Sequence, residues 1–131
     1  MTRPGQLEIK IRLYCGDEIA MGPGKADLLD AIEAEGSISG AGRALGMSYR
    51  RAWLLVDTMN RCWGERLVET VSGGSHEKGA RVSAAGKAVL TAYRALQQGA
   101  ETGAAPLLNG SSLTVLMRDA PLTPGTGSRR S

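Results

Sequence analysis

The hydrophobic positions change their period along the chain, beginning with strict alternation. From residue 7 to residue 14, apolar positions alternate with charged residues and Tyr14. This period of two predicts a half-buried β-strand. A turn at Cys15-Gly16-Asp17 follows, and the segment 18–21 is expected to return as a second strand with Ile19 and Met21 facing inward. The start of the chain therefore predicts a β-hairpin.

A helical period replaces the alternation between residues 26 and 62, where apolar residues recur every three or four positions. A first helix is expected over 26–35. A second should begin after a Ser37 N-cap and end at Gly46, and a third should begin after a Ser48 N-cap. The residues expected on the three buried faces are Leu28, Leu29 and Ile32, then Ile38, Ala41 and Leu45, then Ala52, Leu55 or Val56, and Met59.

Two groups of glycines interrupt this pattern. Gly22-Pro23-Gly24-Lys25 places Gly-Lys before a helix, but a phosphate-binding loop needs a glycine where Ile19 lies and Ser or Thr where Ala26 lies. We therefore expect this segment only to end a strand and begin a helix. Gly40 and Gly42 lie inside the second helix, where each costs up to about 1 kcal/mol relative to Ala. These glycines indicate either that a neighbouring helix approaches closely or that evolutionary drift in the sequence has been tolerated there.

Beyond Trp63-Gly64 the pattern predicts two strands, 67–72 and 80–83, around a glycine-rich loop over 73–79. A helix over 84–98 should follow a Ser83 cap, with Val89 or Leu90, Tyr93, and Leu96 or Gln97 as its stripe. That apolar stripe is longer than is needed to cover a small hairpin, so part of it is expected to face a second copy of the chain. We predict one domain over 1–98 and a largely disordered Gly/Ala/Ser/Pro-rich tail over 99–131, in which 113–117 forms a strand or docks.

The composition narrows the classes of protein to consider. The chain has 131 residues, 42% of them hydrophobic, and a formal charge of +3. This modest basic bias permits a nucleic-acid partner without demanding one. Cys15 and Cys62 have no metal-ligand spacing, and the lone His76 lacks ligating neighbours, so no metal is expected. No apolar run approaches the roughly 20 residues that span a bilayer, and no secretory leader is evident, so a cytoplasmic protein without membrane contact is expected.

The two short helices around Gly46 form a predicted helix-turn-helix. In such motifs the first residues of the second helix, here Tyr49, Arg50 and Arg51, meet base edges in the major groove. Arg50 and Arg51 are each assigned either to a base or to a flanking phosphate, without a choice between the two. Trp53 either packs on the helix pair or lies close to DNA. The candidate contacts to backbone phosphates are Ser37, Arg43 and Ser48 in the motif, and His76, Lys78 and Arg81 in the glycine-rich hairpin. Ser37 and Ser48 could instead serve only as helix caps, and the hairpin loop could be merely solvated.

The segment from Lys25 to Tyr93 resembles the DNA-binding domain of ModE-type molybdate-responsive regulators. The residues that carry the resemblance are Gly36-Ser37-Ile38-Ser39, Gly46-Met47-Ser48-Tyr49-Arg50-Arg51-Ala52-Trp53, Met59-Asn60, Leu67-Val68-Glu69-Thr70, Gly73-Gly74, Gly79-Ala80-Arg81-Val82-Ser83 and Gly86. The resemblance implies a mainly α fold with small β, a winged helix-turn-helix of the class that LysR-type regulators also use. It also implies an N-terminal β-hairpin and homodimerisation through the C-terminal helix.

The sequence therefore predicts a sequence-specific transcriptional regulator that binds double-stranded DNA as a homodimer. Regulators of this type carry C-terminal molybdate-binding domains, which the residues after 98 are too few to encode, so we expect no molybdate site in this chain. The alternative is a winged-helix adaptor that binds proteins and no DNA. An enzyme is disfavoured because no Ser-His-Asp, Cys-His or paired-carboxylate arrangement is evident, and no cofactor is expected.

Overall fold

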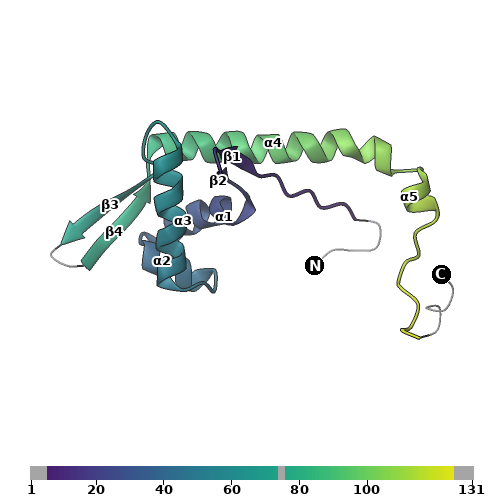
Figure 1. Cartoon of the computed structure of the whole chain (residues 1–131), viewed down its shortest axis with the longest axis horizontal. Coiled ribbons are helices and arrows are strands. Elements are labelled where there is room, and N and C mark those ends of the chain that lie inside the picture. Colours follow the sequence, from purple (N-terminus) through teal and green to yellow (C-terminus); the bar gives the residue numbers. More distant parts are fainter. Residues whose placement is uncertain (1–5, 74–75, 126–131) are drawn as a thin grey trace. The chain divides into compact units, whose positions relative to one another are not determined.

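The computed structural model describes residues 6–73 and 76–125 of the chain. The fold is mainly helical with two small antiparallel sheets, as the sequence predicts (Figure 1). The chain divides into two compact units, one formed by Lys10–Gln97 and the other by Met1–Ile9 together with Gln98–Ser131. The first unit holds the candidate site.

The first hairpin consists of β1 (Leu13–Cys15) and β2 (Glu18–Met21), joined by a turn in which Gly16 adopts φ +59. The turn and the return strand confirm the prediction. The expected strand over 7–14 is wrong for all but its last two residues, because residues 6–12 form no strand. Its partner β2 is only four residues long, so only the end of the alternating segment finds a ladder to pair with.

Helix α1 (Pro23–Glu35) begins three residues earlier than predicted, with Pro23 in its first turn and Gly22 as its N-cap. Proline suits this position, because its missing N–H would have no helical partner there. The predicted stripe is confirmed, since Leu28, Leu29 and Ile32 are fully buried in the core. The helix ends at Gly36, which adopts φ +77.

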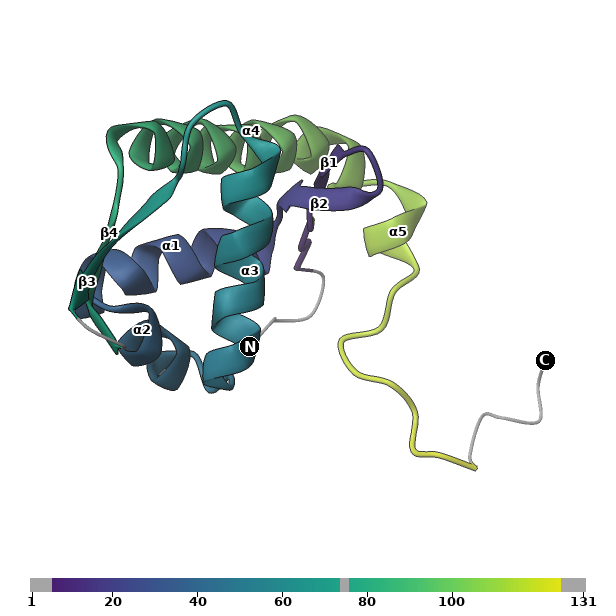
Figure 2. The same cartoon turned by 60° about the vertical axis from the view of Figure 1, so that its left-hand side comes forward.

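Helices α2 (Ile38–Ala44) and α3 (Tyr49–Cys62) follow and pack on each other (Figure 2). On α3, Val56 rather than Leu55 is fully buried, together with Ala52 and Met59. A Cβ at Gly42 would lie 3.3 Å from the Ala52 Cβ, so the helices approach closely there. This favours close approach over drift as the reason for that glycine.

The second hairpin consists of β3 (Val68–Gly73) and β4 (His76–Val82). Strand β3 lies one residue later than predicted and β4 begins four residues earlier, so the predicted seven-residue loop over 73–79 is wrong. Pairing continues to Gly73 and His76 across a bulge between Val71 and Ser72, where Lys78 is the extra residue of β4, and Gly73 and Gly79 are both part of the ladder. The expected loop residues 74 and 75 lie outside the described residues.

One side chain of α3 holds the start of this hairpin. The Asn60 Oδ1 accepts hydrogen bonds from the N–H groups of Leu67 (2.8 Å) and Val68 (3.1 Å), and its Nδ2 donates to the Val68 carbonyl (3.1 Å). At the other strand the Ala80 N–H donates to the Gly36 carbonyl at 2.8 Å. The hairpin is thus fixed both to α3 and to the end of α1.

Helix α4 (Ala84–Leu108) begins after Ser83, whose Oγ accepts from the Gly86 N–H at 3.0 Å. Within the unit of residues 10–97 it is fixed by Tyr93, which is 2% exposed and donates its hydroxyl to the Ile11 carbonyl. Arg94 pairs with Asp27 (3.1 Å) and Asp30 (2.8 Å) of α1. The predicted cap and the buried Tyr93 are confirmed.

The predicted helix end at Gln98 is wrong, because α4 continues to Leu108. Alanines at 100, 104 and 105 favour the helix strongly enough to carry it past Gly99 and Gly103. The segment 113–117, expected as a strand or a docked patch, instead begins with one turn of helix, α5 (Ser112–Val115), and its large apolar side chains are exposed. None of the helices in the described ranges combines the length and apolarity that crossing a membrane requires.

Candidate nucleic-acid interface

The turn between α2 and α3 has a defined hydrogen-bond pattern. The Gly46 N–H donates to the Arg43 carbonyl (3.1 Å) and the Met47 N–H donates to the Gly42 carbonyl (2.9 Å). With Gly46 at φ +71, these two bonds form a Schellman motif, which ends a helix sharply. Leu45 is therefore the last residue before the turn and is 39% exposed, so its predicted place on the buried stripe is wrong.

Both serines proposed for DNA contact cap helices. The Ser37 Oγ accepts from the Gly40 N–H at 2.9 Å, and the Ser48 Oγ accepts from the Arg51 N–H at 3.1 Å. Capping is thus confirmed as a role for each. Ser48 is exposed and Ser37 half-buried, so both hydroxyl groups retain the capacity to donate to a phosphate.

The first turn of α3 presents Tyr49, Arg50 and Arg51 at the surface, where all three side chains are exposed. Tyr49 contacts Trp53 edge to face, with ring centroids 6.1 Å apart. Trp53 is partly buried against the core, which confirms packing for its ring, although its buried Nε1 has no hydrogen-bond partner among the described residues. The rigid indole therefore supports the tyrosine at the tip of the helix.

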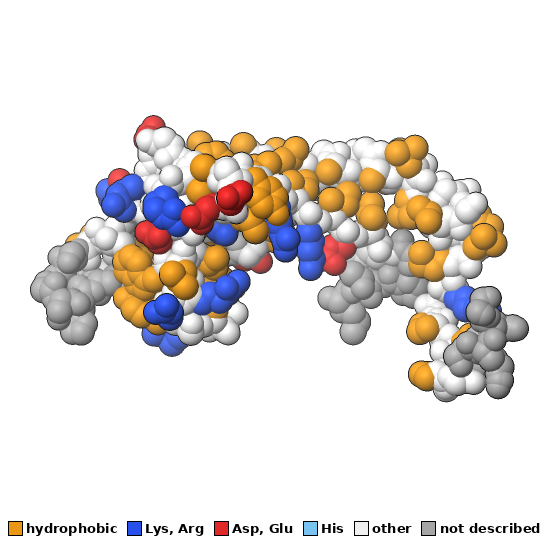
Figure 3. Space-filling view, in the orientation of Figure 1, with side chains coloured by type: hydrophobic (Ala, Val, Ile, Leu, Met, Phe, Trp, Pro, Cys, Tyr) orange, Lys and Arg blue, Asp and Glu red, His pale blue; other side chains and the backbone are white. Residues whose placement is uncertain are grey.

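The basic side chains differ in whether they meet an acid. In the described part of the chain, the cations that pair with carboxylates are Arg61, Arg81, Lys87 and Arg94. The predicted contacts Arg43, Arg50 and Arg51 make no side-chain hydrogen bond or ion pair with any described residue. The face shown in Figure 3 has Lys and Arg without adjacent acids over the lower end of this unit, near α2 and the start of α3, whereas acids and further Lys and Arg lie side by side above them.

The opposite end of α3 carries a neutralised arginine. Arg61 donates to Glu18 at 3.0 Å and to Asp57 at 2.9 Å, and these hydrogen bonds raise its pKa. The charge of α3 is therefore asymmetric, with free cations in its first turn and a paired cation in its last.

The candidate residues of the second hairpin are less uniform. Arg81 lies opposite Glu69 in the β3–β4 register and donates to it at 2.9 Å, with 77% of its side chain exposed. Its charge is thus partly offset. His76 and Lys78 lie on β4 instead of in a loop, and their side chains are outside the described residues.

The structure also gathers cations that sequence analysis did not connect. Lys10, Arg12 and Lys25 line one pocket together with Arg51. They come from separate segments, so no spacing in the sequence links them. The only sequence signal at this pocket is the Gly22-Pro23-Gly24-Lys25 segment, which does not fit the pattern of a phosphate-binding loop. Over the residues that are described, no cluster of three or more His, Cys, Asp or Glu suitable for a metal ion occurs.

Comparison with known proteins gives related sequences, although no family model matches the chain. It is 40% identical over 90 residues to the molybdenum-pterin-binding protein MopA of Rhodobacter capsulatus, covering 69% of this chain and 34% of that protein. It is 43% identical over 70 residues to the molybdenum transport protein ModE of Azotobacter vinelandii, covering 53% and 26% respectively.

A third relative is the DNA-binding transcriptional dual regulator ModE of Escherichia coli (strain K12), 32% identical over 93 residues, which cover 71% of this chain and 36% of the regulator. A further relative is the molybdenum-pterin-binding protein MopB of Rhodobacter capsulatus, of whose length the matched segment covers 40%. The chain thus spans between 26% and 40% of the length of these four curated relatives. The names describe binding, transport and regulatory proteins and no enzyme. The chain is therefore related in sequence to the ModE and Mop proteins.

Proposed function

We propose that this chain is a winged helix-turn-helix module of a transcriptional regulator and binds double-stranded DNA sequence-specifically. The observation that carries the proposal is the set of exposed, unpaired arginines at positions 43, 50 and 51, gathered at the corner between α2 and α3. Arg61, Lys87 and Arg94 are offset by acids, whereas these three arginines have no described acid partner and are available for phosphates and bases.

In this proposal α3 enters the major groove with its first turn leading. Arg50 is exposed and unpaired, and a guanidinium binds guanine O6 and N7 in a bidentate manner. Tyr49, fixed against Trp53, contacts the adjacent base or sugar. Arg43, Arg51 and the cap hydroxyls of Ser37 and Ser48 contact the phosphates on either side of the groove, where N–H groups of a helix start already favour an anion.

The β3–β4 hairpin serves as the wing. Its two attachments, to Asn60 and to Gly36, hold it beside the helix pair so that it reaches the neighbouring backbone. His76 and Lys78 on β4 are proposed to contact phosphates there. Arg81 is also proposed to contact a phosphate. To do this, its guanidinium leaves the ion pair with Glu69 and binds a phosphate of the DNA backbone.

We further propose a homodimer in which α4 is the contact. An apolar pocket of about 170 Å³ lies beside this helix, lined by Leu13, Trp63, Val89, Ala92, Tyr93 and Leu96. Leu96 is 45% exposed although its neighbours on the same stripe are partly or fully buried. A second copy of α4 would cover this surface, and two-fold symmetry would place two recognition helices on a palindromic site.

The proposed activity is limited to the residues of this chain. The chain spans at most 40% of the length of the relatives named above, so molybdenum binding and transport, which their names describe, are not proposed for it. No residue of this chain is assigned to molybdate. The partition into a binding domain over 1–98 and a tail over 99–131 also stays a prediction.

A binding experiment with a matched arginine control tests the proposal. A cognate duplex is first selected from a random-sequence pool with the intact protein, and affinities for it and for a scrambled duplex are then compared. Arg50→Ala should weaken cognate binding by about 1–3 kcal/mol while changing scrambled binding much less. Arg61→Ala removes the same charge at the other end of the helix and should change both affinities little. Equal losses on both duplexes for Arg50→Ala would refute base recognition.

The alternative is a winged-helix adaptor that binds a protein. It draws support from the apolar side chains on the exposed face of α3, since Tyr49 is 51% and Leu54 53% exposed. The salt dependence of duplex affinity distinguishes the two functions. A DNA-binding module should show log K falling linearly with log salt concentration, with a slope of about 0.9 per neutralised phosphate, whereas an adaptor should bind duplex weakly or not at all.

A further inference from the structure

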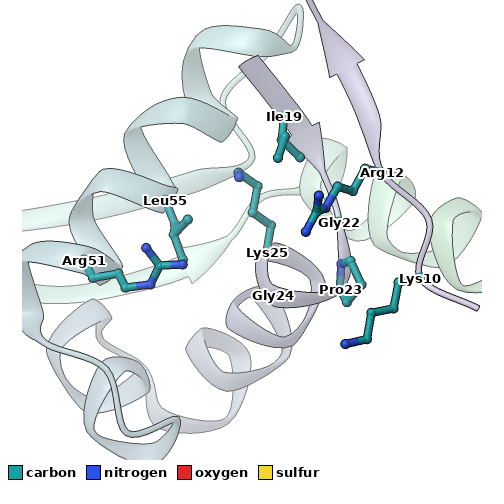
Figure 4. A pocket seen from close by; sticks show the side chains of 9 residues that line it. All are labelled: Lys10, Arg12, Ile19, Gly22, Pro23, Gly24, Lys25, Arg51 and Leu55. Atoms are coloured by element: carbon teal, nitrogen blue, oxygen red, sulfur yellow. The ribbon is translucent and has the colours of Figure 1, made fainter. Parts of the chain in front are cut away.

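A basic pocket lies between the start of α1 and the first two turns of α3. It has a volume of about 280 Å³ and is lined by Lys10, Arg12, Ile19, Gly22, Pro23, Gly24, Lys25, Arg51 and Leu55. Four of these residues are cations and none is an acid. Figure 4 shows the Lys25 side chain rising from the first turn of α1 between those of Arg51 and Arg12, with Lys10 at the outer edge.

Lys25 is the unusual member of this pocket. Its side chain is only 9% exposed, yet it makes no hydrogen bond or ion pair with any described residue. Burial lowers its pKa from the ordinary 10.5, and the nearby guanidinium groups of Arg51 and Arg12 lower it further. The Cys62 thiol and the Glu18 carboxylate act in the opposite direction, although Glu18 is itself bound to Arg61. The Lys25 ammonium therefore lies in a confined, partly desolvated place without an acid in contact, and an anion in the pocket would supply the missing counter-charge.

The backbone supplies a second set of donors. The first helical hydrogen bond of α1 is donated by the Ala26 N–H to the Gly22 carbonyl at 2.9 Å, so the N–H groups of Gly24 and Lys25 precede it. No side chain caps this helix start, and no acidic residue occupies its first turn. The positive end of a 13-residue helix therefore faces the pocket without a partner among the described residues.

We propose that this pocket binds a phosphate group, with Lys25 as its buried anchor, Arg12 and Arg51 as flanking donors and the first amides of α1 as the cradle. The absence of a P-loop pattern is no obstacle, because the cations converge from three segments. Two sources supply this chemistry, a free phosphate-type oxyanion or a backbone phosphate of bound DNA. The second source rests on the proposed DNA-binding function, whereas the first does not.

The test uses Lys25→Met, which removes the charge while nearly keeping the volume. Because the substitution removes a partly desolvated cation that lies close to Arg12 and Arg51, the variant should fold and should melt at least as high as the wild type without added anion. Lys87→Met is the matched control, since Lys87 is exposed and pairs with Glu33 outside the pocket.

In the first arm, Tm is measured against inorganic phosphate or sulfate, with chloride holding the ionic strength constant. A free-oxyanion site predicts a saturating rise in Tm for wild type and Lys87→Met that is absent in Lys25→Met. In the second arm, duplex affinity is measured against salt. A site for backbone phosphate predicts weaker binding by Lys25→Met and a slope reduced by about 0.9, with Lys87→Met unchanged.

The two arms also separate this proposal from the DNA-binding proposal. If the chain binds no duplex at all, the first arm still decides whether the pocket takes an oxyanion. The proposal is overturned if Lys25→Met responds to phosphate and sulfate as the wild type does and also leaves duplex affinity and its salt slope unchanged.

Discussion

Gly86 lies where α4 begins against the second hairpin, and it offers a direct test of this packing. A Cβ at this position would collide with the Leu67 carbonyl oxygen and lie 2.6 Å from the Val82 Cγ1. Leu67 cannot retreat easily, since it is fully buried and its N–H is held by Asn60 at 2.8 Å. Overpacking of this kind costs about 1–3 kcal/mol, whereas Ala gains about 1 kcal/mol over Gly in a helix. Gly86→Ala should therefore destabilise the fold by up to about 2 kcal/mol.

Gly24→Ala is the matched control, because Gly24 also lies in the first turn of a helix but has no described heavy atom within 4 Å of the place that an added Cβ would take. It should be neutral or stabilise the fold by up to about 1 kcal/mol. Urea unfolding followed by far-UV circular dichroism gives both free energies of unfolding. If Gly86→Ala proves as stable as Gly24→Ala, the close contact between α4 and the β3 segment is refuted.

Three other substitutions test separate parts of the structure. Asn60→Ala should cost about 2–4 kcal/mol in urea unfolding, because it leaves two buried N–H groups and a carbonyl unpaired; a cost below about 1 kcal/mol would contradict the described contacts. The lowered pKa of Lys25 means that the unfolded chain binds more protons between the folded pKa and 10.5, so the free energy of unfolding should rise with pH across that window, and Lys25→Met should abolish that part of the rise. Leu96→Glu should weaken self-association at least about tenfold by sedimentation equilibrium, while Thr91→Glu on an exposed part of the same helix should not.

Local patterns predicted the helical part of the fold well. The spacing of Leu28, Leu29 and Ile32 identified the buried face of α1, and Ser37 and Ser48 were correctly placed as caps. These features depend on residues within one or two turns of each other, so the sequence contains the information directly.

The errors arose at strand ends, which depend on a partner strand, and at helix ends, where the hydrophobic period gives no boundary. The strand expected from residue 7 is short because its partner β2 is short, and the hairpin strands reach Gly73 and His76 because a bulge keeps them paired. Leu45 fits a helical stripe, but the Schellman turn places it at the surface. Helix α4 continues past both Gly99 and Gly103, through a segment that also contains Ala100, Ala104 and Ala105.

The candidate site divides in the same way. The exposed first turn of α3 follows from the helix-turn-helix pattern and its cap. The pocket that joins Arg51 to Lys25 and Arg12 depends on how β1, β2 and α1 pack against α3, so no single stretch of sequence predicts it. Arg50 and Arg51, equivalent in the sequence, thus have different surroundings.

Amide NMR spectra of the protein titrated with a mixed-sequence duplex at low salt would show which surface meets DNA, because non-specific binding uses the same cationic groups and needs no known operator. If α3 and the wing bind the duplex, chemical-shift changes should concentrate at Ser48–Arg51 and along the β3–β4 hairpin, and they should fade as salt is raised. Changes confined to α4, or the absence of any change at low salt, would show that the proposed DNA-binding surface is wrong.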